Sequence, residues 1–174
     1  CPLHGPVLEG DLLAEALQAY SAWASYTPEQ EGVLVAYSSV YGNTKKAVEY
    51  LAEELKAKGC PKVVVCDLPR EDMAEAVEDA FRYGKIVLAT TTYNNEIFPF
   101  MKQFIDHLTE RNYQNRTLGF IENGTWAPAA AKTMKAMFEK SKNINYIDTT
   151  VTLRSAMTDE NAEAIERMAE ELCR

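Results

Sequence analysis

The sequence predicts an α/β domain in which a five-stranded parallel sheet carries helices on both faces. From Gly32 onward, short β-rich runs alternate with segments of helical periodicity. The first and third runs are almost wholly apolar, as expected of central strands that are covered on both sides. The length of 174 residues corresponds to about one domain. Because strands that alternate with helices are joined by right-handed crossovers, neighbouring strands are expected to run parallel.

Residues 1–31 precede the alternating region and are predicted to form a linker and a helix. The first six residues contain two prolines and a glycine, which favour a loop. Between residues 8 and 26, apolar side chains recur at spacings of three and four, as along one face of a helix. Thr27 ends this helix because the residue before a proline disfavours helical backbone. Residues 32–174 form the predicted domain.

Within that domain the pattern predicts strands and helices in strict alternation. The strands are expected at 33–37, 62–66, 85–90, 117–122 and 146–152. The helices are expected at 45–58, 71–81, 101–108, 130–138 and 165–172. In such folds ligands bind beyond the carboxyl ends of the strands. The loops that follow Tyr37, Thr90 and Glu122 are therefore the candidate ligand-binding loops.

The composition argues against two classes of partner. The net charge is −8, from 18 basic and 26 acidic residues, whereas nucleic-acid-binding domains carry a basic surface. An anionic membrane surface would also repel the chain, and no apolar run reaches the length of about 18 residues that a membrane-spanning helix needs. The four cysteines form no Cys-x-x-Cys pair, which favours a reducing compartment such as the cytoplasm. We expect an acidic domain that holds a small molecule.

The first candidate loop runs from Ser38 to Thr44 and leads directly into a predicted helix. A helix N-terminus offers free backbone N–H groups and about half a positive charge, which together suit a phosphate. Glycine lets the backbone approach a ligand closely, and hydroxyl and amide side chains add neutral donors. The same residue types are common at ordinary helix N-caps, so the loop alone fits either interpretation. The candidate phosphate-binding residues are Ser39, Val40, Tyr41, Gly42, Asn43 and Thr44.

The loops after the third and fourth strands each combine polar groups with one aromatic residue. Tyr93 and Trp126 are expected at the same edge of the sheet as the first loop. Two aromatic rings beside amides and hydroxyls suit a flat polar ring system, and each contact adds about 0.5–1.5 kcal/mol beyond area burial. Taken singly, Trp126 also fits a core anchor and Tyr93 a surface aromatic. The candidate residues are Thr91, Thr92, Tyr93 and Asn94 in one loop and Asn123, Gly124, Thr125 and Trp126 in the other.

With these motifs the sequence resembles the flavodoxin family from about Gly32 to the C-terminus. The stretch from Ser39 to Thr44 is similar to that family's phosphate loop. Within the family, the sequence resembles the C-terminal domain of flavodiiron proteins (A-type flavoproteins). Three features carry this likeness: the aromatic loop variant Tyr41-Gly42-Asn43-Thr44, the second loop Thr92-Tyr93-Asn94-Asn95, and Pro2-Leu3-His4-Gly5, which resembles the end of a preceding metallo-β-lactamase-like domain. The implied fold is a flavodoxin-like three-layer sandwich with strand order 2-1-3-4-5.

The resemblance implies that the chain binds flavin mononucleotide (FMN) and transfers electrons. It implies no catalytic residue in this chain, because the cofactor carries the redox chemistry. In a longer flavodiiron protein the electrons would pass to a diiron domain of the same or a neighbouring subunit, which reduces O2 or NO. The implied electron donor is a rubredoxin-like protein or a reductase. His4 would be an iron ligand only in that longer protein. A diiron site needs several histidines and carboxylates, and this chain has just one other histidine, His107.

Other functions stay open at this point. A stand-alone flavodoxin would share the loops, and an NAD(P)H:quinone reductase-like flavoprotein would in addition turn over NADH with quinones. A receiver-type signalling module has the same sheet topology but needs an acidic cluster at the ends of the first and third strands. Ser38-Ser39 and Thr90-Thr91 occupy those positions, which disfavours the signalling function.

Overall fold

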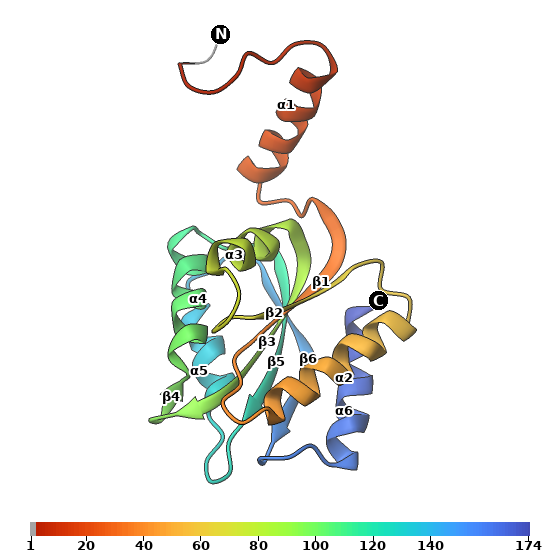
Figure 1. Ribbon diagram of the computed structural model, residues 1–174, viewed down its shortest axis with the longest axis vertical. Coiled ribbons are helices and arrows are strands. Elements are labelled where there is room, and N and C mark those ends of the chain that lie inside the picture. The colour runs from red at the N-terminus through yellow and green to blue at the C-terminus, as the bar shows by residue number, and fades with distance from the viewer. Residues whose placement is uncertain (1–2) are drawn as a thin grey trace.

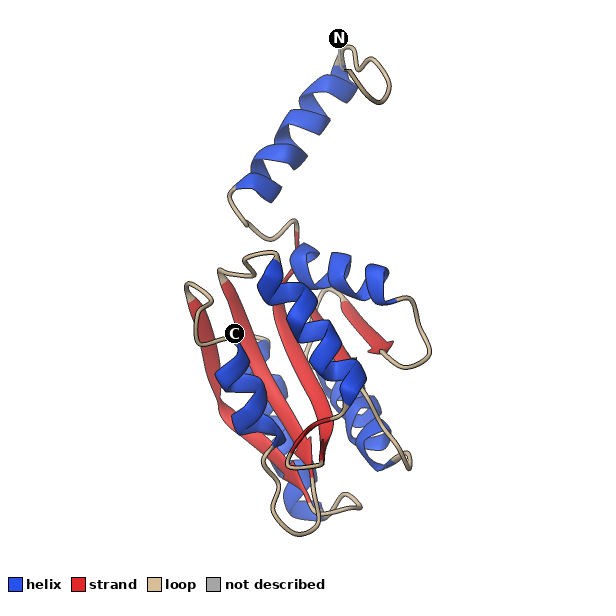
Figure 2. Ribbon diagram, turned by 90° about the vertical axis from the view of Figure 1, so that its left-hand side faces the viewer, coloured by secondary structure: helices blue, strands red, loops and turns tan. Residues whose placement is uncertain are grey.

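The computed structural model describes residues 3–174 and has the predicted architecture, a parallel sheet between two layers of helices (Figures 1 and 2). Each predicted strand and helix corresponds to an observed element, with small differences at the ends. The strands are β1 (Gln30–Tyr37), β2 (Val63–Asp67), β3 (Tyr83–Tyr93), β4 (Glu96–Ile97), β5 (Arg116–Asn123) and β6 (Ile144–Leu153). The helices are α1 (Asp11–Ala24), α2 (Asn43–Ala57), α3 (Met73–Arg82), α4 (Pro99–Glu110), α5 (Ala130–Met137) and α6 (Asp159–Leu172).

The sheet has six strands, so the prediction of a five-stranded sheet in the order 2-1-3-4-5 is wrong in its count and numbering. Five parallel strands follow the order β2-β1-β3-β5-β6, and the short β4 pairs antiparallel with the end of β3. The extra strand exists because the chain reverses within two residues. Asn94 and Asn95 have φ values of 49° and 62°, the left-handed conformation that a two-residue hairpin turn requires and that asparagine tolerates.

The central strands are apolar because they face a core on each side. In β1, Leu34 and Ala36 pack into the core under α3, α4 and α5. Val33, Val35 and Tyr37 alternate with them and pack into the core under α2 and α6. Figure 1 shows the two helical layers on opposite sides of the sheet. This double coverage explains why the sequence of β1 shows little alternation of apolar and polar residues.

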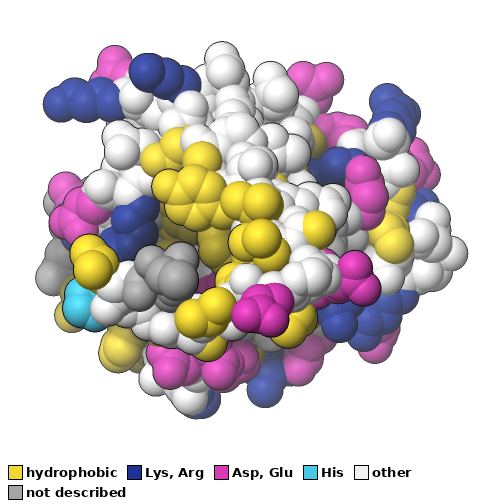
Figure 3. All heavy atoms as spheres, turned by 90° about the horizontal axis from the view of Figure 1, so that it is seen from above, with side chains coloured by type: hydrophobic (Ala, Val, Ile, Leu, Met, Phe, Trp, Pro, Cys, Tyr) yellow, Lys and Arg dark blue, Asp and Glu magenta, His cyan; other side chains and the backbone are white. Residues whose placement is uncertain are grey.

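Helix α1 projects from the domain and contacts neither core (Figure 1). Its apolar spacing correctly predicts a helix, but none of its residues is buried. Figure 3, viewed from the end that carries α1, shows hydrophobic side chains gathered there. No helix within residues 3–174 is both long enough and apolar enough to cross a membrane. The exposed large side chains of α1 are Leu12, Leu13, Leu17, Tyr20 and Trp23.

The joint between α1 and the domain is held by Arg116, whose side chain is buried at the start of β5. Its guanidinium donates hydrogen bonds to the carbonyl oxygens of Tyr26, Gln114, Asn115 and Phe81. Burial lowers the pKa of Arg116, although the Tyr113 hydroxyl and Glu29 favour its charged form. Within residues 3–174, its Nε is the buried side-chain nitrogen without a hydrogen-bond partner. A buried arginine thus ties the turn after α1 to the amino-terminal edge of the sheet.

Candidate functional site

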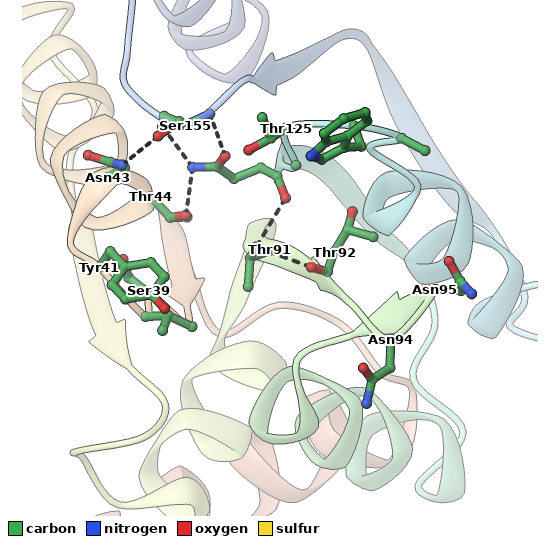
Figure 4. Close-up of a pocket in the computed structure, with 15 residues that line it drawn as sticks. Ser39, Tyr41, Asn43, Thr44, Thr91, Thr92, Asn94, Asn95, Thr125 and Ser155 are labelled. Atoms are coloured by element: carbon green, nitrogen blue, oxygen red, sulfur yellow. Dashed lines mark hydrogen bonds between the residues drawn. The ribbon is translucent and has the colours of Figure 1, made fainter.

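A cavity of about 420 Å³ lies at the carboxyl ends of β1, β3, β5 and β6, where ligands of doubly wound sheets bind. Its volume falls within the range of small-molecule sites. Figure 4 shows side chains from four separate loops around it. All the lining residues are uncharged: Ser39, Val40, Tyr41, Asn43, Thr44, Thr91, Thr92, Asn94, Asn95, Asn123, Gly124, Thr125, Trp126, Ala127 and Ser155.

The loop after β1 presents the N-terminus of α2 to the cavity. Gly42 is the N-cap residue and has a φ of 89°, a left-handed conformation that favours glycine. Its backbone N–H donates to Ser39 Oγ over 3.1 Å, which closes the turn. Among the described residues no side chain caps α2, so its first backbone N–H groups are available to a ligand. Tyr41 beside them is 92% exposed.

The loop after β3 is anchored to its neighbours through hydroxyl groups. Thr91 Oγ1 donates to the carbonyl oxygen of Asn123 over 3.1 Å. Thr92 Oγ1 accepts from the backbone N–H groups of Ala129 and Ala130, at 3.0 and 3.2 Å, and so holds the start of α5. The hairpin turn at Asn94 then carries the chain away from the sheet along the cavity wall.

Asn123 connects three of the loops, including those that carry Thr44 and Ser155, which are labelled in Figure 4. Its Nδ2 donates to the Ser155 carbonyl oxygen over 3.0 Å and lies 3.4 Å from Thr44 Oγ1, and its Oδ1 accepts from the Ser155 N–H over 3.0 Å. Asn43 Nδ2 adds a bond of 3.3 Å to Ser155 Oγ. Because Asn123 is buried, these bonds fix the loops after β1, β5 and β6 relative to one another.

The loop after β5 leaves its aromatic residue bare. Trp126 is 97% exposed although it lines the cavity, so the alternative of a core anchor does not describe it. Asn123 fixes the start of this loop. The carboxylate of the neighbouring Glu122 fixes the far end, because it accepts from the Ala131 N–H over 2.9 Å, and it also accepts from Thr152 Oγ1 over 2.9 Å. An exposed indole at this position suits contact with a flat apolar surface.

The structure brings together most of the residues proposed from the sequence. Two of them, Gly42 and Tyr93, do not line the cavity. Gly42 forms the N-cap of α2, and the Tyr93 ring packs edge-on against Phe98 with 5.5 Å between the ring centroids. Asn95, Ala127 and Ser155 line the cavity in addition. Ser155 follows β6, and the signal for it is topological, because the carboxyl end of that strand reaches the same edge of the sheet as those of β1, β3 and β5.

The groups directly behind the cavity are also neutral. Ser38 directly follows β1, and Thr90 lies near the carboxyl end of β3. Both are fully buried, and their hydroxyl oxygens lie 2.7 Å apart. They occupy the positions where a receiver-type domain needs acidic residues. Tyr37 is shielded beside them, and burial together with its hydrogen bond to Asp67 Oδ2 raises its pKa above the ordinary value. The groups that line the cavity are therefore dipoles rather than formal charges.

Metal-binding residues do not gather in the part of the chain that the structure describes. Across residues 3–174, no group of three or more histidine, cysteine, aspartate or glutamate side chains could hold a metal ion. His4, the residue that the resemblance relates to iron, is exposed near the start of the described region.

Comparisons with known proteins agree with the geometry. A family model described as "Flavodoxin domain" matches residues 34–159. The chain is 25% identical over 177 residues to the rubredoxin-oxygen oxidoreductase of Megalodesulfovibrio gigas, covering 100% of this chain and 43% of that protein. The flavodiiron protein of Giardia intestinalis superposes with a TM-score of 0.82 at 20% identity, over 95% of this chain and 42% of that one. An archaeal flavodoxin gives a TM-score of 0.70 at 17% identity, over 82% of this chain and 96% of that one.

The shares of each chain that are aligned show which part of the relatives this chain resembles. The chain spans less than half the length of the rubredoxin-oxygen oxidoreductase, and its alignment with that protein includes the region of α1. The flavodiiron superposition likewise covers nearly all of this chain, whereas the archaeal flavodoxin matches a smaller share of it.

Proposed function

The chain belongs to the flavodoxin domain family, whose cofactor is FMN, and we propose that it is the electron-transferring FMN domain of a flavodiiron protein. One observation carries the choice of site: an uncapped helix N-terminus and a nearly fully exposed tryptophan line the same uncharged cavity. A phosphate ester attached to a flat ring system is bound favourably by this pair of features.

The donor set of the first loop fits a phosphate dianion. The N-terminus of α2 supplies backbone N–H groups and the positive end of the helix dipole. Ser39, Asn43 and Thr44 would add neutral side-chain donors to the same group. Because all lining residues are uncharged, no carboxylate opposes the anion, even though the protein as a whole carries a charge of −8.

The loops after β3 and β5 fit the ring system. Trp126 would cover one face of the ring, and the amides and hydroxyls of Thr92, Asn94 and Thr125 would bond its polar edge. When bound, FMN supplies the redox chemistry by accepting and releasing electrons. This chain's residues bind the cofactor, orient it and restrict its contact with water. Gly124 helps because a Cβ there would lie 3.0 Å from the Cα of Pro128, so a larger residue would require the loop to shift.

In the longer protein, we propose that residues 1–31 connect the domain to a preceding metallo-β-lactamase-like domain. Two observations support this: α1 exposes its large apolar side chains, and the rubredoxin-oxygen oxidoreductase that matches the whole chain is more than twice as long. The proposed electron acceptor is the diiron domain of the same or a neighbouring subunit, to which His4 would contribute a ligand. The proposed donor is a rubredoxin-like protein or a reductase.

An FMN titration tests the site directly. Added FMN is expected to bind with a shift of its visible absorption and quenching of its fluorescence. Trp126→Ala should weaken the affinity roughly 2- to 12-fold, since an aromatic contact contributes about 0.5–1.5 kcal/mol. Trp23→Ala is the matched control, because Trp23 is also exposed but lies on α1, outside the cavity. Equal affinities for the two variants would contradict the assignment of Trp126, and absence of binding would contradict the function.

The alternative of an NAD(P)H:quinone reductase-like flavoprotein makes a different prediction. Such an enzyme oxidises NADH with quinones without a partner protein. The FMN-loaded domain proposed here should show little of this turnover but should accept electrons from a reduced rubredoxin. Rapid steady-state oxidation of NADH by the domain alone would favour the reductase.

A further inference from the structure

Two cysteines lie at the ends of neighbouring helices, on the face of the sheet covered by α2 and α6. Cys60 follows the glycine that ends α2, and Cys173 is the C-cap residue of α6. The two helices pack against each other through the core on that side. Cys60 is partly exposed and Cys173 is exposed, whereas Cys66 is buried.

The two cysteines meet at one backbone carbonyl. The N–H of Cys60 donates to the carbonyl oxygen of Leu55 over 3.0 Å. The Sγ of Cys173 lies 4.0 Å from the same oxygen. The Cys60 thiol itself donates to the Lys62 carbonyl oxygen over 3.3 Å. Both cysteine residues line a small cavity of about 110 Å³ between the helix ends.

Side-chain contacts hold the two helix ends in this arrangement. Lys58 Nζ lies 3.2 Å from Glu170 Oε1 and so bridges the last turns of α2 and α6. Lys85 Nζ donates to the Leu172 carbonyl oxygen over 2.6 Å and fixes the end of α6 against β3. These two contacts hold the helix ends that carry Cys60 and Cys173 next to each other.

We propose that Cys60 and Cys173 form a reversible disulfide when the protein meets a peroxide, and that this bond locks the end of α6 to the end of α2. The exposed Cys173 thiolate attacks one oxygen of hydrogen peroxide, which breaks the O–O bond and leaves a sulfenic acid and a hydroxide ion; the hydroxide takes up the proton that the thiol released and becomes water. The Cys60 thiolate then attacks that sulfur, which forms the S–S bond and breaks the S–O bond, and the second hydroxide becomes water by taking up the proton released by Cys60. Two thiols lose two electrons and two protons, and the peroxide accepts both.

The electrostatic surroundings set the conditions for the assay. Burial and the neighbouring Cys60 raise the pKa of the Cys173 thiol, and Lys85 and Lys58 partly oppose this. The reaction should therefore speed up with rising pH, because only the thiolate reacts. Burial and Glu71 raise the pKa of Cys66 to about 12, so Cys66 serves as an internal control that stays reduced.

The test is peptide mapping of the chain before and after treatment with hydrogen peroxide at mildly alkaline pH. All samples carry Cys1→Ser, which removes the Cys1 thiol from the assay. Trypsin should then release peptide Gly59–Lys62 linked to peptide Met168–Arg174, and a reductant should separate the two. Cys60→Ser should abolish the linked peptide and leave a sulfenic acid on Cys173 that dimedone traps.

Two results would overturn the proposal. One is oxidation of both thiols to separate sulfinic acids without a linked peptide. The other is a linked peptide found only in covalent dimers of the chain. Thermal unfolding gives an independent measure, since the disulfide closes a loop that contains most of the domain and should raise the Tm by several degrees. An oxidised protein with an unchanged Tm would show that the bond does not lock the two helix ends.

Discussion

The two edges of the sheet are built in opposite ways. At the carboxyl ends of the strands, hydroxyl and amide side chains and the Glu122 carboxylate connect the loops. The residues that line the cavity there are uncharged, and the Trp126 ring is exposed. At the amino edge, a charged guanidinium is buried and donates to four backbone carbonyl oxygens around the turn after α1. A buried charge is costly unless it is hydrogen-bonded. The stability of the domain at the amino-terminal ends of the strands therefore depends on these hydrogen bonds of Arg116. The carboxyl edge instead keeps its donors available to a ligand.

Removal of the buried guanidinium should have the largest effect on stability. Arg116→Met leaves carbonyl oxygens without donors, including those of Tyr26 and Phe81, and should lower the free energy of unfolding by about 3 kcal/mol. Urea denaturation measures this loss. FMN affinity should not change, because Arg116 lies at the opposite edge. A variant as stable as the original protein would show that the two edges do not differ in this way.

Loss of the loop connection at the carboxyl edge should reduce both stability and binding. Asn123→Ala removes the bonds to both backbone groups of Ser155, and should cost about 2 kcal/mol of unfolding free energy. FMN affinity should fall as well, because the cavity loops lose their common anchor. Asn143→Ala is the matched control, since the Asn143 amide bonds Asn115 at the amino edge. Asn143→Ala should leave FMN affinity unchanged, and equal losses of affinity in the two variants would refute the role of Asn123.

The smallest effect concerns pH. Glu171 accepts bonds from the N–H groups of Asp148 and Thr149 in an irregular part of β6. Burial alone would raise the pKa of Glu171, but the bonds from Thr149 and Asp148 outweigh burial and lower it. A lowered pKa means that the unfolded chain binds the proton more readily, so this stabilisation is present above the unfolded value of about 4.3 and is lost as the pH falls through the folded value.

Glu171→Gln tests this contribution through the Tm measured between neutral and acidic pH. The Tm of the original protein should fall more steeply toward acidic pH than that of the variant. FMN affinity should be insensitive to the substitution, because the cavity is lined by uncharged groups. Parallel Tm curves for the two proteins would refute the contribution of Glu171.

Much of the fold follows from periodicity, since apolar runs and helical spacing depend on burial against a layer. Periodicity could not predict β4, because a strand of two residues is too short to show an alternation of apolar and polar side chains. The pair Asn94-Asn95, which favours a left-handed turn, is the local signal for it. The burial of Arg116 could not be predicted, because arginine is usually exposed. The carbonyl oxygens that make its burial possible come from segments far apart in the sequence and meet only in the folded domain.

The site was predictable where a loop feeds directly into a helix, as at Ser39 to Thr44. Ser155 could not be found in this way, because it takes part through its backbone bonds to Asn123, which depend on the packing of β6 against β5. Tyr93 was predicted to line the site but does not. Its ring packs against Phe98, and this contact depends on the hairpin between β3 and β4, which the sequence pattern did not predict.

The position of Ser155 in the cavity wall has a consequence for how the protein is made. The loop that contains Ser39 leaves the ribosome well before Ser155, which follows β6. Because domains fold as units during synthesis, the cavity closes only after β6 has paired with β5. Cofactor loading must therefore wait for almost the whole domain to emerge, so the bound cofactor marks a chain whose translation has passed its final strand.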